Sequence, residues 1–255
     1  MSDAKRPVVL VTGVGRRIGI GAGLAERLAA TGWDVAFTYF SGYDDRMPWG
    51  QDLAARDEIT GVLAGHGARV FSVEADFEDV AAPAEVFRLA NEALGSVQAL
   101  VMSHCESVDS GILDTTIESF DRHFAVNARA TWLLIKAFAE QYDAPYGDGR
   151  IVALTSDHTV GNLPYGASKG ALDRITLAAG QELSHLGITA NVINPGPIDT
   201  GWMAPEMVEQ FTAENPLKRA GRPADTANLV AFLCSPEGGW INSQLLTSNG
   251  GWRAG

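Results

Sequence analysis

The run Pro7-Val-Val-Leu-Val-Thr12, which leads directly into Gly13-Val-Gly15-Arg16-Arg17-Ile18-Gly19-Ile-Gly21, decides the fold. Its first part is short, apolar and rich in β-branched residues, which is typical of a strand buried on both faces. Its second part is a glycine-rich turn, and Leu24 and Leu28 continue from it at helical spacing. A strand, a glycine turn and a helix in this order predict a dinucleotide-binding loop, because glycines let the backbone approach a diphosphate and a helix N-terminus offers N–H groups.

Strand-like and helix-like segments alternate along the rest of the chain. Further strands are expected over residues 34–40, 69–74, 97–102, 150–155, 188–193 and 244–247, and helices over residues 51–65, 83–94, 116–141, 165–186 and 223–234. This alternation predicts a parallel sheet with right-handed crossovers. The fold class expected is therefore α/β, a single Rossmann-type doubly wound domain over residues 1–255 with helices on both faces of the sheet.

The composition is that of an ordinary globular protein, with 255 residues, 46% hydrophobic and 20% charged. The formal net charge of −12 argues against nucleic acid and anionic membranes as partners. The two cysteines, Cys105 and Cys234, have no metal-type spacing and indicate reduced thiols in a cytoplasmic protein without a metal site. Residues 1–6 lack an apolar signal-peptide core and are expected to form a flexible tail.

Tyr165 and Lys169 form the candidate catalytic pair. Asn162 is suited to cap a helix and Pro164 fits a first turn, so the spacing of four places both side chains on one helix face. A cation beside a phenol favours the phenolate and is expected to lower the tyrosine pKa. Such a tyrosine can exchange a proton with an alcohol oxygen.

The end of the second strand bears on the choice of cofactor. An NAD-binding chain places a carboxylate there for the ribose 2′-hydroxyl, whereas this chain has Tyr39-Phe40-Ser41. Together with Arg16 and Arg17 in the glycine loop, this favours NADP(H). NAD(H) remains the alternative, because the loop over residues 41–50 is long enough for Asp44 or Asp45 to fold back onto the ribose.

Thr12-Gly13, Gly19, Asp76, Asn127, Ser156, Tyr165, Lys169 and Pro195-Gly196 resemble the motif series of the short-chain dehydrogenase/reductase family. The order and spacing of these motifs match over nearly the whole chain. Within the family, the chain most resembles the 3-oxoacyl-carrier-protein reductase-like members. The resemblance implies a seven-stranded parallel sheet, hydride transfer between NAD(P)(H) and a ketone or secondary alcohol, and a homotetramer or homodimer. The sequence pattern and the resemblance together predict the residues that bind the cofactor, namely Gly13, Gly15, Arg16, Arg17, Ile18, Gly19, Tyr39, Ser41, Asp76, Phe77, Ser103, His104, Tyr165, Lys169, Pro195, Gly196, Ile198 and Thr200.

The resemblance also implies catalytic roles. Tyr165 would be the general acid of reduction, Lys169 would lower the pKa of Tyr165, and Ser156 would hold the carbonyl oxygen. Asn127 would anchor a water that links Lys169 to solvent, and Thr200 would fix the nicotinamide carboxamide. A 3-oxoacyl thioester is one candidate substrate, and residues 197–222 are expected to form a substrate-side lid with Trp202, Met203, Met207 and Phe211.

Three features depart from the family pattern. Arg17 replaces a glycine, Met102-Ser103-His104-Cys105 replaces Asn-Asn-Ala-Gly, and only eight residues separate Ser156 from Tyr165. A dinucleotide-binding sensor or scaffold with little turnover is therefore the alternative function. His158, two residues after Ser156, is hypothesised to face the substrate.

Overall fold

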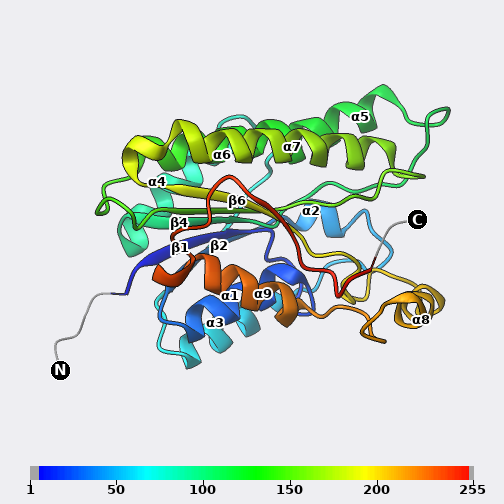
Figure 1. Ribbon diagram of the computed structural model, residues 1–255, viewed down its shortest axis with the longest axis horizontal. Coiled ribbons are helices and arrows are strands. Elements are labelled where there is room, and N and C mark those ends of the chain that lie inside the picture. Colours follow the sequence, from blue (N-terminus) through cyan, green and yellow to red (C-terminus); the bar gives the residue numbers. More distant parts are fainter. Residues whose placement is uncertain (1–5, 253–255) are drawn as a thin grey trace.

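The computed structural model describes residues 6–252 as three layers, in which helices cover both faces of a seven-stranded sheet (Figure 1). All strand pairings are parallel and the strand order is β3-β2-β1-β4-β5-β6-β7, so the α/β fold and the doubly wound sheet are confirmed. The strands are β1 (Val8–Thr12), β2 (Asp34–Tyr39), β3 (Val70–Glu74), β4 (Val97–Met102), β5 (Arg150–Leu154), β6 (Thr189–Asn194) and β7 (Leu245–Thr247).

Most helices lie where the sequence predicts them, and the differences are an interruption, a later start and two additional helices. They are α1 (Ile20–Ala30), α2 (Ser41–Asp44), α3 (Ala55–Gly65), α4 (Ala82–Leu94), α5 (Ile117–His123), α6 (Ala130–Gln141), α7 (Leu163–Glu182), α8 (Pro205–Glu214) and α9 (Pro223–Leu233), with a π-helical segment η1 (Phe124–Arg129) and two 3-10 turns, η2 (Ser184–Leu186) and η3 (Pro236–Gly238). The expected single helix over residues 116–141 is thus interrupted by η1. The expected helix over residues 51–65 begins only at Ala55, and α2 and α8 were not expected.

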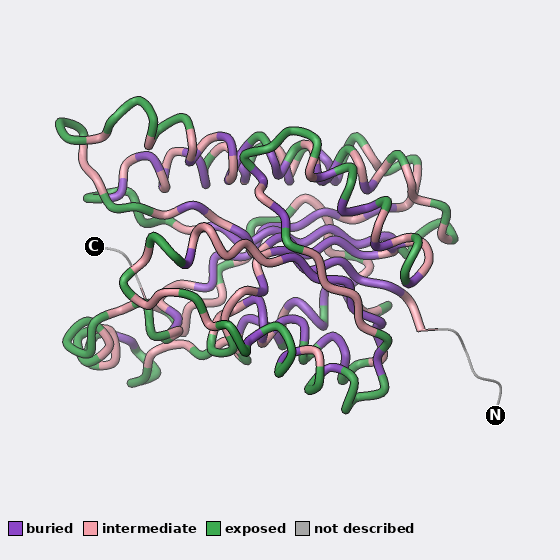
Figure 2. Tube along the Cα trace, turned by 180° about the vertical axis from the view of Figure 1, so that it is seen from behind, coloured by how far each residue is buried: buried purple, intermediate pink, exposed green. Residues whose placement is uncertain are grey.

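Strand β1 is at the centre of the core, and every one of its residues is buried (Figure 2). Successive side chains of a strand point to opposite faces. Val9 and Val11 accordingly pack with Leu24 and Leu28 of α1 on one face. On the other face, Leu10 belongs to the cluster that includes side chains from α4, α6 and α7. Both faces of the central strands are therefore apolar, as the continuous run of Val and Leu predicts.

The carboxyl ends of the strands lie at one end of the molecule, together with α2 and α8 (Figure 1). Parallel sheets bind ligands at this edge. The expected tail over residues 1–6 lies outside the described residues except for Arg6. The Arg6 guanidinium donates hydrogen bonds to the carbonyls of Trp33 and His66, so this residue is held against the fold and is not part of a flexible tail.

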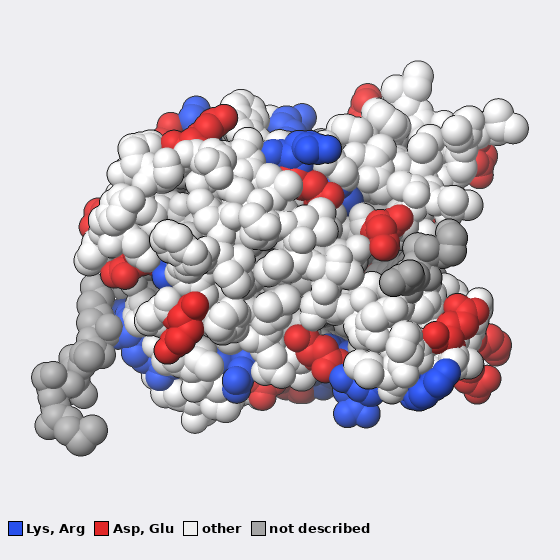
Figure 3. Space-filling model, viewed as in Figure 1, with Lys and Arg blue, Asp and Glu red and all other residues white. Residues whose placement is uncertain are grey.

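Acidic and basic side chains are interspersed around the edge of the face in Figure 3, and a largely uncharged area lies over its centre. No helix within residues 6–252 has both the length and the apolar character that a membrane span requires.

Candidate active site

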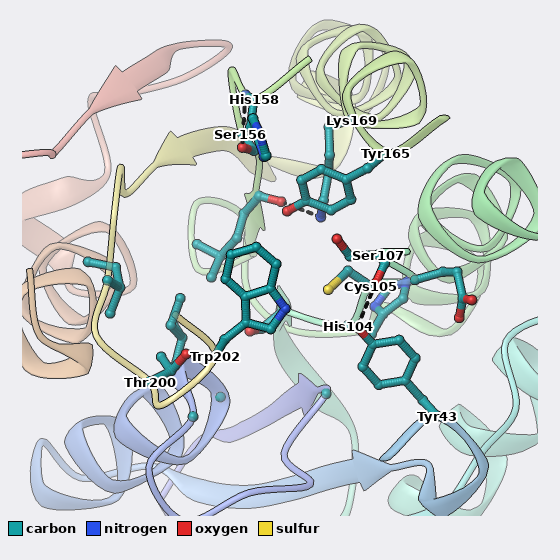
Figure 4. Close-up of a pocket in the computed structure, with 18 of the residues that line it drawn as sticks. Tyr43, His104, Cys105, Ser107, Ser156, His158, Tyr165, Lys169, Thr200 and Trp202 are labelled. Carbon is teal, nitrogen blue, oxygen red and sulfur yellow. Dashed lines mark hydrogen bonds between the residues drawn. The ribbon is translucent and has the colours of Figure 1, made fainter. Parts of the chain in front are cut away.

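A cavity of about 660 Å³ opens at the carboxyl ends of the strands (Figure 4). It is lined by the glycine loop, by the segments that follow β2 to β6, by the start of α7 and by residues from α8. Most of the residues predicted to bind cofactor or to act in catalysis line it, namely Gly13, Gly15, Arg16, Gly19, Tyr39, Asp76, Phe77, Ser103, His104, Ser156, Tyr165, Lys169, Pro195, Gly196, Ile198 and Thr200. Arg17, Ile18, Ser41 and Asn127 do not line it.

Tyr165 and Lys169 lie in the first turns of α7 and point into the cavity (Figure 4). Pro164 occupies the first turn, as predicted, but the Asn162 side chain does not cap the helix. Its amide nitrogen donates to the Ser107 hydroxyl at 3.2 Å instead, which ties the start of α7 to the loop after β4. The pair therefore projects from a helix end that is held by neighbouring loops.

The environment of the pair shifts both pKa values. Burial raises the pKa of Tyr165, and the Ser156 hydroxyl beside it partly opposes this shift. Burial also lowers the pKa of Lys169, whose ammonium donates to the Leu154 carbonyl at 2.9 Å and lies 5.6 Å from the centre of the Tyr165 ring. Burial is the main cause of the net upward shift in the pKa of Tyr165, and the effect of Lys169 on that pKa stays a prediction. The phenol stays protonated near neutral pH, as a proton donor requires.

Ser156 and His158 lie at the edge of the cavity beside Tyr165 (Figure 4). The Ser156 hydroxyl accepts a hydrogen bond from the backbone N–H of His158 at 3.1 Å, which fixes the turn between them. His158 is exposed and is among the residues that line the cavity, and the hypothesis that it faces the substrate stays a prediction.

Asn127 is fully buried within the π-helical segment η1. Its side-chain oxygen accepts from the backbone N–H of Glu106 at 2.8 Å, and its amide nitrogen donates to the Glu106 carbonyl and the Ser168 hydroxyl, both at 2.9 Å. The side chain is therefore engaged in joining the loop after β4 to α7. The expected role of Asn127, in which it anchors a water that links Lys169 to solvent, stays a prediction.

His104 lies beneath the glycine turn and is also buried. Its Nε2 lies 3.1 Å from the Val126 carbonyl, which can only accept, so Nε2 carries the hydrogen. Its Nδ1 therefore accepts from the Thr12 hydroxyl at 2.7 Å. Burial is the main cause that lowers the pKa of His104 to about 3, so the ring is neutral. Both ring nitrogens are engaged, and the residue braces the glycine turn against η1 rather than offering its side chain to a ligand.

The glycine loop fits the diphosphate of a dinucleotide. Gly13 has a φ of +77°, and a Cβ added to it would lie 2.6 Å from the backbone nitrogen of His104. A Cβ on Gly21 would lie 2.3 Å from the Gly13 carbonyl oxygen, so only glycine allows this close packing. Helix α1 begins after Gly19 without a side-chain cap and without an acid in its first turn. Its first N–H groups and partial positive charge therefore remain for an anion.

The two arginines of this loop point in different directions. The Arg16 guanidinium donates to the Thr200 carbonyl at 2.6 Å and stacks 4.5 Å from the centre of the Trp49 ring, within the lining of the cavity. Arg17 instead forms ion pairs with Asp52 and Glu58 at 2.7 and 2.6 Å on the surface. Arg17 is therefore a surface residue that holds the loop against the start of α3. The prediction that it lines the cofactor site is not met.

Ile18 and Ser41 also lie outside the cavity. The Ile18 side chain is exposed, and the Ser41 N–H donates to the Glu74 carboxylate at 2.9 Å. Neither residue is therefore among those that line the cavity, in contrast to the prediction that both bind the cofactor.

The loop over residues 41–50, called the strap below, supplies cavity residues that the sequence did not single out. The Tyr43 hydroxyl donates to the Ser107 carbonyl at 3.2 Å. Arg46 forms a bidentate ion pair with buried Glu106, with both N–O distances 2.9 Å. The strap thus crosses from β2 to the loop after β4. The sequence had indicated only that this loop is long and carries Asp44 and Asp45, and it did not single out Tyr43 or Arg46.

The lid expected over residues 197–222 contains α8. Trp202, Met203, Met207 and Phe211 line the cavity as predicted, and Phe211 meets Trp252 edge-on with 5.4 Å between ring centres. This side of the cavity is therefore apolar and aromatic. Among residues 6–252, no group of three or more His, Cys, Asp or Glu side chains is placed to hold a metal ion.

Comparisons with known proteins agree with this geometry. A family model described as "Enoyl-(Acyl carrier protein) reductase" matches residues 13–253. The chain is 34% identical to an NADPH-dependent aldehyde reductase-like protein of Arabidopsis thaliana, over 96% of this chain and 93% of the relative. It is also similar to solved structures of a short-chain dehydrogenase/reductase from Serratia marcescens (28% identity, TM-score 0.85, 97% and 98% of the two chains) and of a short-chain dehydrogenase from Burkholderia cenocepacia in complex with NADP (32%, 0.84, 97% of each chain). The tyrosine–lysine pair at the edge of a doubly wound sheet, the glycine loop and these likenesses together show that the chain belongs to the short-chain dehydrogenase/reductase family.

Proposed function

We propose that the protein is an NADP(H)-preferring oxidoreductase that interconverts a ketone or aldehyde and an alcohol by hydride transfer. The observation that carries this proposal is the convergence of Tyr165, Lys169 and Ser156 in one cavity with the glycine loop. A phenol kept protonated by its surroundings, next to a hydroxyl and an ammonium, is suited to give a proton to an oxygen that gains negative charge.

Tyr165, Ser156 and Lys169 then have distinct tasks. The bound dinucleotide supplies or accepts the hydride. Tyr165 donates the proton to the carbonyl oxygen during reduction, and Ser156 holds that oxygen by a hydrogen bond. Lys169 adds positive charge where oxygen becomes negative, and its buried ammonium is held ready by the Leu154 carbonyl.

The glycine loop, Arg16 and the adenine-side residues Asp76 and Phe77 would hold the cofactor. The preference for NADP(H) is supported by Arg16, whose planar fork of donors suits a phosphate. It is also supported by the absence of a carboxylate at Tyr39-Phe40-Ser41. The relatives named above include an NADPH-dependent reductase and a protein solved with NADP. The Asp44 carboxylate of the strap also lines the cavity.

The apolar lid indicates substrates with apolar or aromatic groups beside the carbonyl. Trp202, Met203, Met207, Phe211 and Trp252 offer large contact surfaces and no charge for a carboxylate substrate. A 3-oxoacyl thioester stays among the candidates because its acyl chain would suit this surface.

The test is to follow NADPH and NADH absorbance with a panel of aryl ketones, aldehydes, 3-oxoacyl thioesters and one enoyl thioester. Carbonyl-dependent oxidation of NADPH, at least about tenfold more efficient than that of NADH, would support the proposal. Tight dinucleotide binding without turnover on any substrate would instead favour the sensor or scaffold alternative. Turnover with NADH equal to or better than that with NADPH would overturn the cofactor preference alone.

We also propose a cytoplasmic homotetramer or homodimer. Free Cys105 and Cys234 are in keeping with a reducing compartment. The exposed side chains of Leu245 in β7 and of Trp240, a few residues before this strand, support self-association. Light scattering of the purified protein tests this, and a monomeric mass at micromolar concentration would contradict it.

A further inference from the structure

The Asp44 carboxylate lies next to the glycine loop although it comes from the strap. Asp44 is the last residue of α2, five residues beyond the end of β2, and it is buried. A Cβ added to Gly15 would lie 2.9 Å from Asp44 Oδ2, so the carboxylate is in direct contact with the loop. Both residues line the cavity. An acidic side chain therefore lies against the glycine loop, in the cavity that the end of β2 also lines.

This carboxylate is held in place by its neighbours. Its Oδ1 accepts from the Trp49 indole N–H at 2.8 Å, and the same indole ring stacks against Arg16. The strap is fixed further along by the Tyr43 and Arg46 contacts with the loop after β4. Because these anchors lie on both sides of Asp44, the carboxylate has little freedom to turn away from the loop.

The region that Asp44 occupies is where the two dinucleotides differ. The diphosphate binds at the glycine loop and the adenosine ribose binds toward the end of β2, so the ribose 2′ position lies between these two segments. A free 2′-hydroxyl there can donate to a carboxylate, whereas a 2′-phosphate carries about −1.5 to −2 charge and is repelled by it. Arg16 attracts the same phosphate, so the two side chains act in opposite senses.

Accordingly, we propose that Asp44 is a cofactor-discriminating residue, whose charge weakens NADP(H) binding relative to NAD(H) and so limits the preference that Arg16 provides. This inference rests on the proposed dinucleotide-dependent function. Burial raises the pKa of Asp44, while the Trp49 hydrogen bond and Arg16 lower it, which agrees with a carboxylate that is partly withdrawn from water beside a cation.

The test is calorimetric titration of the full chain with NADP+ and with NAD+, for the parent and for Asp44→Asn. Asparagine keeps the shape and an oxygen acceptor for Trp49 but removes the charge. We expect Asp44→Asn to bind NADP+ about tenfold more tightly and to bind NAD+ within about threefold of the parent. The adjacent Asp45→Asn is the matched control, because Asp45 is exposed and bonds to Gln51, and it should leave both affinities at the parent values.

The inference would be overturned if Asp44→Asn changes the ratio of the NADP+ and NAD+ affinities by less than about twofold, or if both affinities change by the same factor. Either result would leave the proposed function intact. A parent that binds neither dinucleotide would overturn the proposed function itself. Circular dichroism and thermal melting confirm that each variant is folded. Asp44→Ser, which also removes the charge, must raise the same ratio if Asp44→Asn does not fold.

Discussion

Replacing His104 by glutamine should make the stability of the protein less sensitive to mild acid. The folded protein keeps His104 neutral, with its ring hydrogen-bonded to Thr12 and Val126 and its pKa lowered to about 3. The unfolded chain has the ordinary histidine pKa of about 6.5. Because the folded-state pKa is depressed, this contribution to stability is fully present above pH 6.5 and is lost as the pH falls toward 3.

The magnitude follows from these two pKa values. Between pH 7 and pH 5 the unfolded state gains most of one proton at this site and the folded state gains almost none, which removes about 2 kcal/mol of the free energy of unfolding. His104→Gln has no such proton to gain. Its free energy of unfolding should therefore fall about 2 kcal/mol less than that of the parent over the same pH range.

Urea unfolding of the apo proteins, followed by circular dichroism at both pH values, measures this difference. Other titrating groups are common to both proteins and cancel in the comparison. His185→Gln is the matched control, since His185 is exposed, and it should retain the pH dependence of the parent. Equal losses of stability in the parent and in His104→Gln would refute the assignment of His104 as a buried neutral brace.

Three further predictions follow from the site. Arg16→Ala should lower the NADPH-to-NADH efficiency ratio about tenfold or more, mainly through weaker use of NADPH, while Arg17→Ala leaves the ratio unchanged; equal effects would mean that Arg16 does not meet the phosphate. Asn127→Leu should lower the free energy of unfolding in urea by about 3–5 kcal/mol, because the Glu106 backbone and Ser168 lose buried partners. A loss below about 1 kcal/mol would contradict the role of Asn127 in joining the loop after β4 to α7. Ser156→Ala should lower kcat about 10²- to 10³-fold with a smaller change in KM, and steady-state kinetics near the parent values would remove Ser156 from the site.

Much of the fold could be predicted from the sequence, because the local pattern of apolar residues matches the residues that the folded protein buries. The Val8–Thr12 run is apolar throughout and the structure buries it on both faces. The four-residue spacing of Tyr165 and Lys169 placed both on one side of α7 because a helix repeats every 3.6 residues. These features depend on residues that are near one another in the chain.

The features that the sequence did not predict depend on distant contacts. The π-helical turn at Asn127 is associated with bonds to Glu106 and Ser168, which are far away in the sequence. The sequence does not distinguish the adjacent Arg16 and Arg17. In the structure, Arg16 stacks on Trp49 in the cavity and Arg17 pairs with Glu58 on the surface. The raised pKa of Tyr165 likewise comes from its burial, which helical spacing does not report.

The most direct test of the account is the Tyr165→Phe variant, assayed with NADPH and the best carbonyl substrate of the parent. The variant keeps the ring and removes only the hydroxyl that donates the proton. We predict that reduction is lost by at least about 10²-fold while calorimetric binding of NADPH stays within about threefold of the parent. Turnover within a few-fold of the parent, with binding equally intact, would contradict Tyr165 as the general acid and with it the central claim.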